Sequence, residues 1–159
     1  DRCRTAHTLS RTLHTLRQVT SGRLICILGP SGEADPSQRP LFGRVAEKAA
    51  DVTIVTANNP GSEHPLQIAH DVLDGYNRPD RAIVCPDRRR AIHTALDLAT
   101  TGDTVLISGK GHDTLQHIET TVIPFDDQQV AATWLYEFSA KQEYPASLSS
   151  AATDLFNLN

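Results

Sequence analysis

The sequence of 159 residues contains no methionine, one tryptophan and only three cysteines. No two cysteines form a Cys-x-x-Cys pair, and Cys26 and Cys85 lie in apolar runs, which favours buried reduced thiols. No apolar run approaches the roughly 20 residues that a membrane-spanning helix needs, and no signal-peptide pattern opens the chain. We therefore expect a cytoplasmic protein, and the start at Asp1 without methionine suggests a fragment of a longer one.

Positive charge is also scarce, because 19 acidic residues face 15 lysines and arginines and the formal net charge is -4. Nucleic acids and anionic membranes are bound through a concentrated positive field. The composition therefore argues against both partners. The basic run Arg88-Arg89-Arg90 lies where a helix is expected to begin, and we interpret it as a solvent-exposed helix face.

The chain lacks the motifs of several catalytic classes. No GxxxxGK[ST] P-loop is present to bind a triphosphate, and the first glycine-containing loop, 29–33, lacks the GxGxxG spacing of a dinucleotide site. The seven histidines show no zinc-ligand spacing, and there is neither a nucleophile elbow nor a Cys/His signature. We therefore predict no metal site, and any ATP chemistry requires a P-loop from elsewhere.

What the sequence does contain is a regular alternation of short apolar runs with amphipathic segments. The segment 6–18 has helical spacing, and further helices are predicted to begin near Pro40, Pro65 and Asp87. The runs that predict buried strands are 24–28, 52–55, 82–85 and 104–107. This alternation predicts an α/β protein, a Rossmann-like three-layer domain with a mostly parallel sheet.

The pattern changes after residue 114. The stretch 115–125 is rich in β-formers, with a possible turn at Glu119-Thr120-Thr121, and predicts a terminal hairpin that adds one or two antiparallel edge strands. Asp126-Asp127 is expected to cap a helix. We place the end of the folded domain at residue 137 and interpret 138–159 as a partly disordered tail.

Three polar loops, 29–39, 57–65 and 109–113, follow predicted strands. In a parallel sheet these loops emerge at one edge, which is where open α/β proteins bind ligands. The third loop, Gly109-Lys110-Gly111-His112-Asp113, combines permissive backbone with chargeable side chains. The three loops therefore predict one composite ligand site.

Several motifs recur in the same order in the C-terminal domain of Mur ligases. They are 22–29, Arg39-Pro40-Leu41, Ala50-Asp51-Val52, Asn59-Pro60, Asp87-Arg88 with Ala91-Ile92, and Gly109-Lys110-Gly111-His112. Over residues 1–137 the chain resembles the MurE type, which adds the third residue of the peptidoglycan stem peptide. Several ordered motifs are more specific than any one alone. The resemblance implies a cytoplasmic, ATP-dependent amide ligase whose N-terminal and central domains lie outside this chain.

The resemblance also implies cofactors and partners. ATP and Mg²⁺ would be bound mostly by the central domain, and the substrates would be a UDP-N-acetylmuramoyl dipeptide and a free amino acid, diaminopimelate or another diamino acid. ATP phosphorylates the D-glutamyl carboxylate, and the amine of the amino acid attacks the acyl phosphate. The C-terminal domain closes over ATP and selects the amino acid, which excludes water from the reactive intermediate. The isolated domain, with no catalytic residues of its own, is expected to be inactive.

Site residues follow from the same resemblance, position by position. Arg39, Asn59, Gly109 and Asp113 are expected to contact the incoming amino acid, and Asp1 to face the nucleotide. Arg39 suits a carboxylate, Asp113 an ammonium and Asn59 either, while Gly109 lets the ligand approach the backbone.

The roles of two residues are open, and several motifs differ from those usual in the family. Lys110 and His112 are expected either to bind phosphate or to fix the turn. The departures are 58–61, where the family usually has Asp-Asn-Pro-Arg, 31–35, where it has Gly-Gly-Asp-Arg-Asp, Asp113 in place of glutamate, and Arg2 and Arg4 in place of tyrosine and histidine. Two alternatives therefore stay open: a degenerate Mur-like domain that serves as a binding or regulatory module, and a related ligase such as a folylpolyglutamate synthetase.

Overall fold

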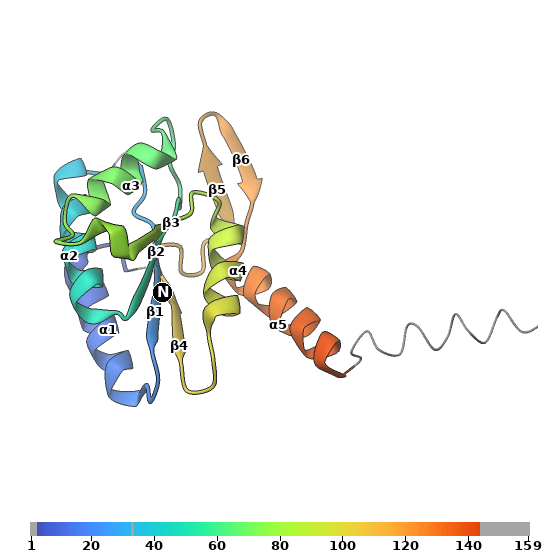
Figure 1. Cartoon of the computed structure of the whole chain (residues 1–159). Coiled ribbons are helices and arrows are strands. Elements are labelled where there is room, and N and C mark those ends of the chain that lie inside the picture. Colours follow the sequence, from blue (N-terminus) through green and yellow to red (C-terminus); the bar gives the residue numbers. More distant parts are fainter. Residues whose placement is uncertain (1–2, 33, 144–159) are drawn as a thin grey trace, which may run out of the picture. The chain divides into compact units, whose positions relative to one another are not determined.

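The computed structural model of the chain describes residues 3–32 and 34–143 (Figure 1). The chain divides into two compact units, Asp1–Asp127 and Gln128–Asn159. All described strands belong to the first unit. The predicted tail lies mostly outside the described residues, and its first part, 138–143, is helical.

Four parallel strands form the central sheet of the first unit, in the order β3-β2-β1-β4. They are β1 (Leu24–Leu28), β2 (Val52–Val55), β3 (Ala82–Val84) and β4 (Thr104–Ile107). Central β1 pairs on both sides, so that Ile25 lies opposite Val52 and Val105. Every residue of β1 is buried, as expected for a strand covered on both faces. The predicted parallel sheet is confirmed.

Helices cover both faces of this sheet. On one face lie α1 (Ala6–Val19), α2 (Arg39–Ala49) and α3 (Pro65–Leu73), and on the other lies α4 (Arg88–Leu98) (Figure 1). Short 3-10 turns, η1 (Pro36–Gln38) and η2 (Pro79–Arg81), precede α2 and β3. Local chemistry sets the helix starts: Thr5 and Thr8 form a capping box, and the Asp87 carboxylate accepts the Arg90 N–H at 3.0 Å. The predicted three-layer α/β fold is confirmed.

The main apolar core lies between the sheet and the three-helix face. Leu9 and Leu13 of α1 have no exposed surface, and they pack with β1 residues and Phe42 of α2. Tyr76 is also buried here, and its hydroxyl hydrogen-bonds to the Thr53 hydroxyl at 3.0 Å. This core fixes α1 and α2 against the sheet and so positions the loops at its carboxyl edge.

The hairpin β5 (Leu115–Ile118) and β6 (Thr121–Pro124) is a separate two-stranded antiparallel sheet. It therefore differs from the expected extension of the main sheet edge. Hydrogen bonds join β5 to the loop after β2: the Gly61 N–H donates to the His117 carbonyl at 3.2 Å, the Gln116 side-chain amide to the Asn58 carbonyl at 2.7 Å, and the His117 N–H to the Asn59 side-chain oxygen at 3.2 Å. The Glu119 N–H in turn donates to the Gly61 carbonyl at 2.7 Å.

Arg88 is buried, so the interpretation of Arg88-Arg89-Arg90 as a solvated face is wrong for its first residue. Its Nε and Nη2 donate to the two Asp127 carboxylate oxygens at 2.8 and 2.7 Å, and Nη2 also donates to the Ser108 carbonyl at 2.9 Å. The physical reason is a bidentate charged partner, which allows a guanidinium to lie inside a protein. Arg89 and Arg90 are exposed, as predicted.

The second unit, as far as it is described, consists of the rest of α5 (Asp127–Glu143). Trp134 and Phe138 stack with ring centroids 4.9 Å apart, one helical turn from each other. No helix in the described part of the chain is both long and apolar enough to span a bilayer. Cys3, Cys26 and Cys85 form no disulfide; Cys3 and Cys26 are buried, whereas Cys85 is only half-buried.

Candidate functional site

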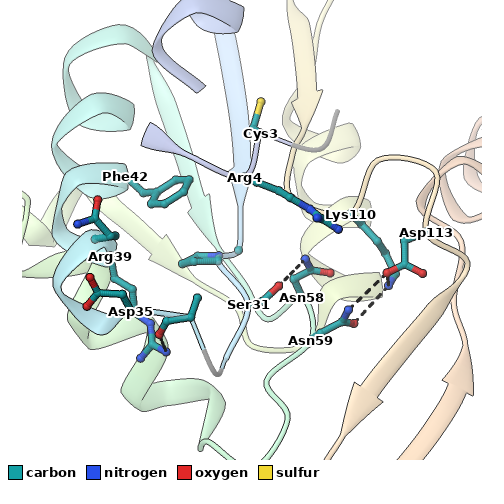
Figure 2. Close-up of a pocket in the computed structure, with 15 residues that line it drawn as sticks. Cys3, Arg4, Ser31, Asp35, Arg39, Phe42, Asn58, Asn59, Lys110 and Asp113 are labelled. Atoms are coloured by element: carbon teal, nitrogen blue, oxygen red, sulfur yellow. Dashed lines mark hydrogen bonds and ion pairs between the residues drawn. The ribbon is translucent and has the colours of Figure 1, made fainter. Parts of the chain in front are cut away.

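The loops that follow β1, β2 and β4 enclose a pocket of about 320 Å³ at the carboxyl edge of the sheet (Figure 2). Each of the three predicted loops contributes to its wall, and α2 and the N-terminal segment complete it. The lining residues include Arg4, Ser31, Ala34, Asp35, Arg39, Phe42, Asn58, Asn59, Gly109, Lys110 and Asp113. The predicted composite site therefore exists as a cavity within the first unit.

Asp113 is a half-buried carboxylate on one side of this pocket. One of its oxygens accepts the Leu115 N–H at 3.1 Å, and the other accepts the side-chain amide of Asn59 at 3.4 Å. Partial burial acts to raise the pKa of Asp113, but the Leu115 hydrogen bond, the charge of Lys110 and the Asn59 amide together hold it below its usual range. The pocket therefore contains a carboxylate that is ionised at neutral pH.

Lys110 contributes to the pocket wall, but its side chain is fully buried. Its ammonium group donates to the Leu115 carbonyl and, at 3.5 Å, to the Asn59 side-chain oxygen. The Asp113 carboxylate lies 3.9 Å away. Burial lowers the pKa of Lys110, against the opposing charge of Asp113. Of the two roles left open by the sequence, these contacts favour fixing the turn.

Gly109 allows the third loop to pass close to the first. Its φ of +106° is a conformation that side chains other than glycine rarely adopt, and a Cβ there would lie 2.7 Å from the Gly29 carbonyl oxygen. Since Gly109 also lines the pocket, a ligand meets bare backbone at this point. The role of Gly109 toward a ligand stays a prediction.

Arg39 reaches the opposite wall, but its charge is already paired. Both terminal nitrogens donate to the Glu63 carboxylate, at 2.7 and 2.8 Å, and one of them also donates to Asp71 at 2.7 Å. The residue is only 1% exposed, and its Nε has no hydrogen-bond partner among the described residues. Arg39 thus holds α2, α3 and the preceding loop together, and a carboxylate ligand would have to compete with two acidic partners.

Asn58 was not selected from the sequence, although it is adjacent to Asn59. Its amide nitrogen donates to the Ser31 hydroxyl at 3.3 Å, and its side-chain oxygen is buried without a hydrogen-bond partner among the described residues. The residue lines the pocket (Figure 2). An unpaired acceptor at 4% exposure is costly unless a ligand or water supplies a donor. The sequence feature that could have identified Asn58 is its place in the polar loop that follows β2.

The remaining predicted residues lie elsewhere. His112 is exposed and does not line the pocket, and Asp1 lies outside the described residues. Within 3–32 and 34–143, no group of three histidine, cysteine or acidic side chains is placed to hold a metal ion.

Comparison with known proteins shows the family to which the chain belongs. The family model described as Mur ligase, glutamate ligase domain, matches residues 4–111. The chain belongs to the Mur ligase family. The resemblance inferred from the ordered motifs is thereby confirmed, and so is the assignment of the chain to the C-terminal domain type.

Curated relatives carry the same name as the resemblance suggested. UDP-N-acetylmuramoyl-L-alanyl-D-glutamate--2,6-diaminopimelate ligase of Aquifex aeolicus is 42% identical over 130 residues, which are 82% of this chain and 27% of the relative. The same enzyme of Xanthomonas oryzae pv. oryzae is 45% identical over 132 residues, 83% of this chain and 27% of the relative. A solved structure with this name superposes with a TM-score of 0.83 at 33% identity, over 87% of this chain and 29% of that one. The chain therefore spans less than a third of the length of these relatives.

Proposed function

We propose that this domain binds the incoming amino acid in an ATP-dependent amide ligase that adds the third residue, a diamino acid, to UDP-MurNAc-L-Ala-D-Glu in peptidoglycan synthesis. The observation that carries the proposal is the meeting of ionised Asp113, Asn59 and the bare backbone of Gly109 in one pocket at the carboxyl edge of the sheet. Membership of the Mur ligase family and relatives named as diaminopimelate ligases support it.

Asp113 would bind an ammonium group of the amino acid and orient it. A carboxylate whose pKa is held below its usual range is a weak base, so Asp113 positions the amine rather than removing its proton. In the reaction the ammonium first loses a proton to solvent, and the neutral amine nitrogen then forms a bond to the carbonyl carbon of the acyl phosphate. Phosphate leaves with the electron pair of the broken C–O bond, and the nitrogen releases a second proton to solvent to give the amide. Asn59 would contact the amino acid through its side-chain amide, and Gly109 through its backbone.

ATP supplies the phosphoryl group that activates the D-glutamyl carboxylate, and Mg²⁺ would accompany it. Their binding, and that of the UDP-sugar, falls to the N-terminal and central domains of the longer protein, since the chain has no P-loop. Residues 1–137 would form the amino-acid-binding domain, with Asp1 toward the nucleotide, and 138–159 a tail. The enzyme would act in the cytoplasm without a nucleic acid or membrane partner.

The test uses the full-length protein with ATP, Mg²⁺, UDP-MurNAc-L-Ala-D-Glu and one diamino acid at a time. We expect a UDP-MurNAc tripeptide and ADP to form together only when the amino acid is present, whereas purified residues 1–159 hydrolyse no ATP. A full-length protein that forms no tripeptide with diaminopimelate, lysine or ornithine would contradict the proposal. That result would favour a degenerate Mur-like module instead.

A further inference from the structure

A closed network of contacts joins Asn59, Lys110, Asp113 and Leu115 at one side of the pocket (Figure 2). The Lys110 ammonium donates to the Leu115 carbonyl and, at 3.5 Å, to the Asn59 side-chain oxygen. The Leu115 N–H donates to one Asp113 oxygen at 3.1 Å, and the Asn59 amide donates to the other at 3.4 Å. Asn59 and Asp113 are the two members to which the proposed function gives a side-chain contact with the amino acid.

The Asn59 side-chain amide has one favourable orientation in this network. Its oxygen faces two donors, the Lys110 ammonium and the His117 N–H at 3.2 Å, while its nitrogen faces the Asp113 carboxylate. If the amide were turned over, its N–H groups would face those donors and its oxygen would face the carboxylate, so all three contacts would become repulsive. Lys110 therefore helps to fix an orientation in which Asn59 donates to Asp113.

Lys110 also acts on Asp113 directly. Its ammonium nitrogen lies 3.9 Å from Asp113 Oδ2, the same oxygen that accepts the Asn59 amide. Because the Lys110 side chain has no exposed surface, water screens this attraction little. The charges of Lys110 and of His117 on β5 both act to lower the pKa of Asp113. Lys110 thus favours the ionised carboxylate and holds its second oxygen toward Asn59.

The ammonium of Lys110 is fully committed to these neighbours. An ammonium has three N–H donors, and three acceptor groups surround this one: the Leu115 carbonyl, the Asn59 oxygen and the Asp113 carboxylate. The side chain has no surface toward the cavity. Contact with a phosphate or with the amino acid would require Lys110 to give up one of these partners.

We propose that Lys110 is a positioning residue for the amino acid: without touching it, the buried ammonium holds the Asn59 amide and the Asp113 carboxylate in the arrangement that receives an ammonium group. The inference rests on the proposed function and deepens it, since Lys110 acts only through the two residues that contact the ligand. Loss of Lys110 should therefore weaken the binding of the amino acid and leave the binding of ATP unchanged.

The kinetic constants of full-length Lys110→Met test the inference. Methionine keeps a long apolar stem in the buried site but has neither a charge nor an N–H donor. For the diamino acid that the unaltered enzyme adds, we expect the KM to rise roughly 3- to 10-fold, the loss of one hydrogen bond, while kcat and the KM for ATP stay within about twofold. Lys48→Met, an exposed change on α2 outside this pocket, is the matched control and should alter none of these constants. An unchanged KM for the amino acid in Lys110→Met would overturn the inference.

A double-mutant cycle shows whether Lys110 acts through Asp113. Made in an Asp113→Asn enzyme, Lys110→Met should raise the KM for the amino acid by less than about twofold, because the carboxylate that it positions is already absent. The same fold-change in both backgrounds would show an independent effect and would contradict positioning. If circular dichroism shows that Lys110→Met is unfolded, Lys110→Gln gives the same comparison, since its uncharged amide still supplies a donor for the Leu115 carbonyl.

The two proposals fail in different ways. An unaltered full-length protein that forms no tripeptide would overturn the proposed function and this inference with it. An active enzyme whose KM for the amino acid does not depend on Lys110 would overturn the inference alone.

Discussion

Removing the Arg88 side chain should destabilise the first unit far more than the loss of an ordinary helix arginine. Arg88 and Asp127 are joined by two charged hydrogen bonds of 2.8 and 2.7 Å, and their side chains are 0% and 6% exposed. Arg88→Met keeps an apolar stem but removes the guanidinium, which leaves the Asp127 carboxylate buried without its charged partner. Breaking a buried pair in this way typically costs about 3–5 kcal/mol.

That cost is a large part of the stability of a domain, which is typically about 5–15 kcal/mol. Urea unfolding followed by far-UV circular dichroism measures it directly. Arg90→Met is the matched control, because Arg90 lies on the same helix and is exposed. It should change the free energy of unfolding by less than about 0.5 kcal/mol.

A double variant distinguishes the effect of an unpaired buried charge from the effect of lost side-chain packing. In Arg88→Met/Asp127→Leu no buried charge is left alone, and apolar replacement of a whole buried pair is often neutral or stabilising. We expect the double variant to regain most of the stability lost in Arg88→Met. A loss below about 1 kcal/mol in Arg88→Met, the range of exposed ion pairs, would refute the reasoning and restore the solvated-face interpretation.

Two further predictions concern stability. The Arg23 guanidinium, with the N–H groups of Arg23 and Thr100, holds the pKa of Asp103 well below its usual range, so stability that is present above about pH 4 should decline as the pH falls toward the folded-state value. Urea unfolding between about pH 4 and pH 2 should show a shallower decline for Asp103→Asn, and parallel curves would contradict this linkage. Gly43→Ala should destabilise by about 1–3 kcal/mol, since its Cβ would lie 2.0 Å from the Val72 carbonyl oxygen, although alanine is normally the better helix former. An unchanged or higher thermal midpoint would show that α2 and α3 tolerate the methyl group.

The sheet was predictable because each strand is an unbroken apolar run. The ranges 24–28, 52–55 and 104–107 match β1, β2 and β4, and β3 ends one residue earlier than predicted. Burial on both faces, complete in β1, removes the alternation that would blur such a run, whereas Ile83 and Val84 of edge strand β3 are exposed. Helix starts were predictable where the cap is local, as at Asp87.

The charged residues were less predictable, because their partners are distant in the sequence. Arg88 is buried by a carboxylate 39 positions away, and Arg39 is paired with acids 24 and 32 positions away. A local pattern contains no information on such pairs. The hairpin was predicted as an element, whereas its separation from the main sheet and its bridge to Gly61 were not.

The candidate site was predictable as a set of loops and less so as individual contacts. Asn59, Gly109 and Asp113 meet in the pocket as expected, since parallel strands bring their following loops to one edge. The lack of a hydrogen-bond partner for the buried side-chain oxygen of Asn58 was not predictable. Only the fold determines which of the two adjacent asparagine amides has no partner among the described residues. Their roles toward a substrate remain predictions.

The most direct test of the amino-acid pocket is the KM of the full-length enzyme for the diamino acid in Asp113→Asn. Asparagine can still accept the Leu115 N–H, now at 3.1 Å, so the loop is retained while the negative charge is lost. Hydrogen bonds to charged groups contribute about 1.5–3 kcal/mol, which corresponds to a rise in KM of roughly 10- to 150-fold. Asp97→Asn, an exposed change outside the pocket on α4, serves as the control. We predict that only the KM for the amino acid rises in Asp113→Asn, with the KM for ATP unchanged; an unaltered KM for the amino acid would contradict the assignment of this pocket.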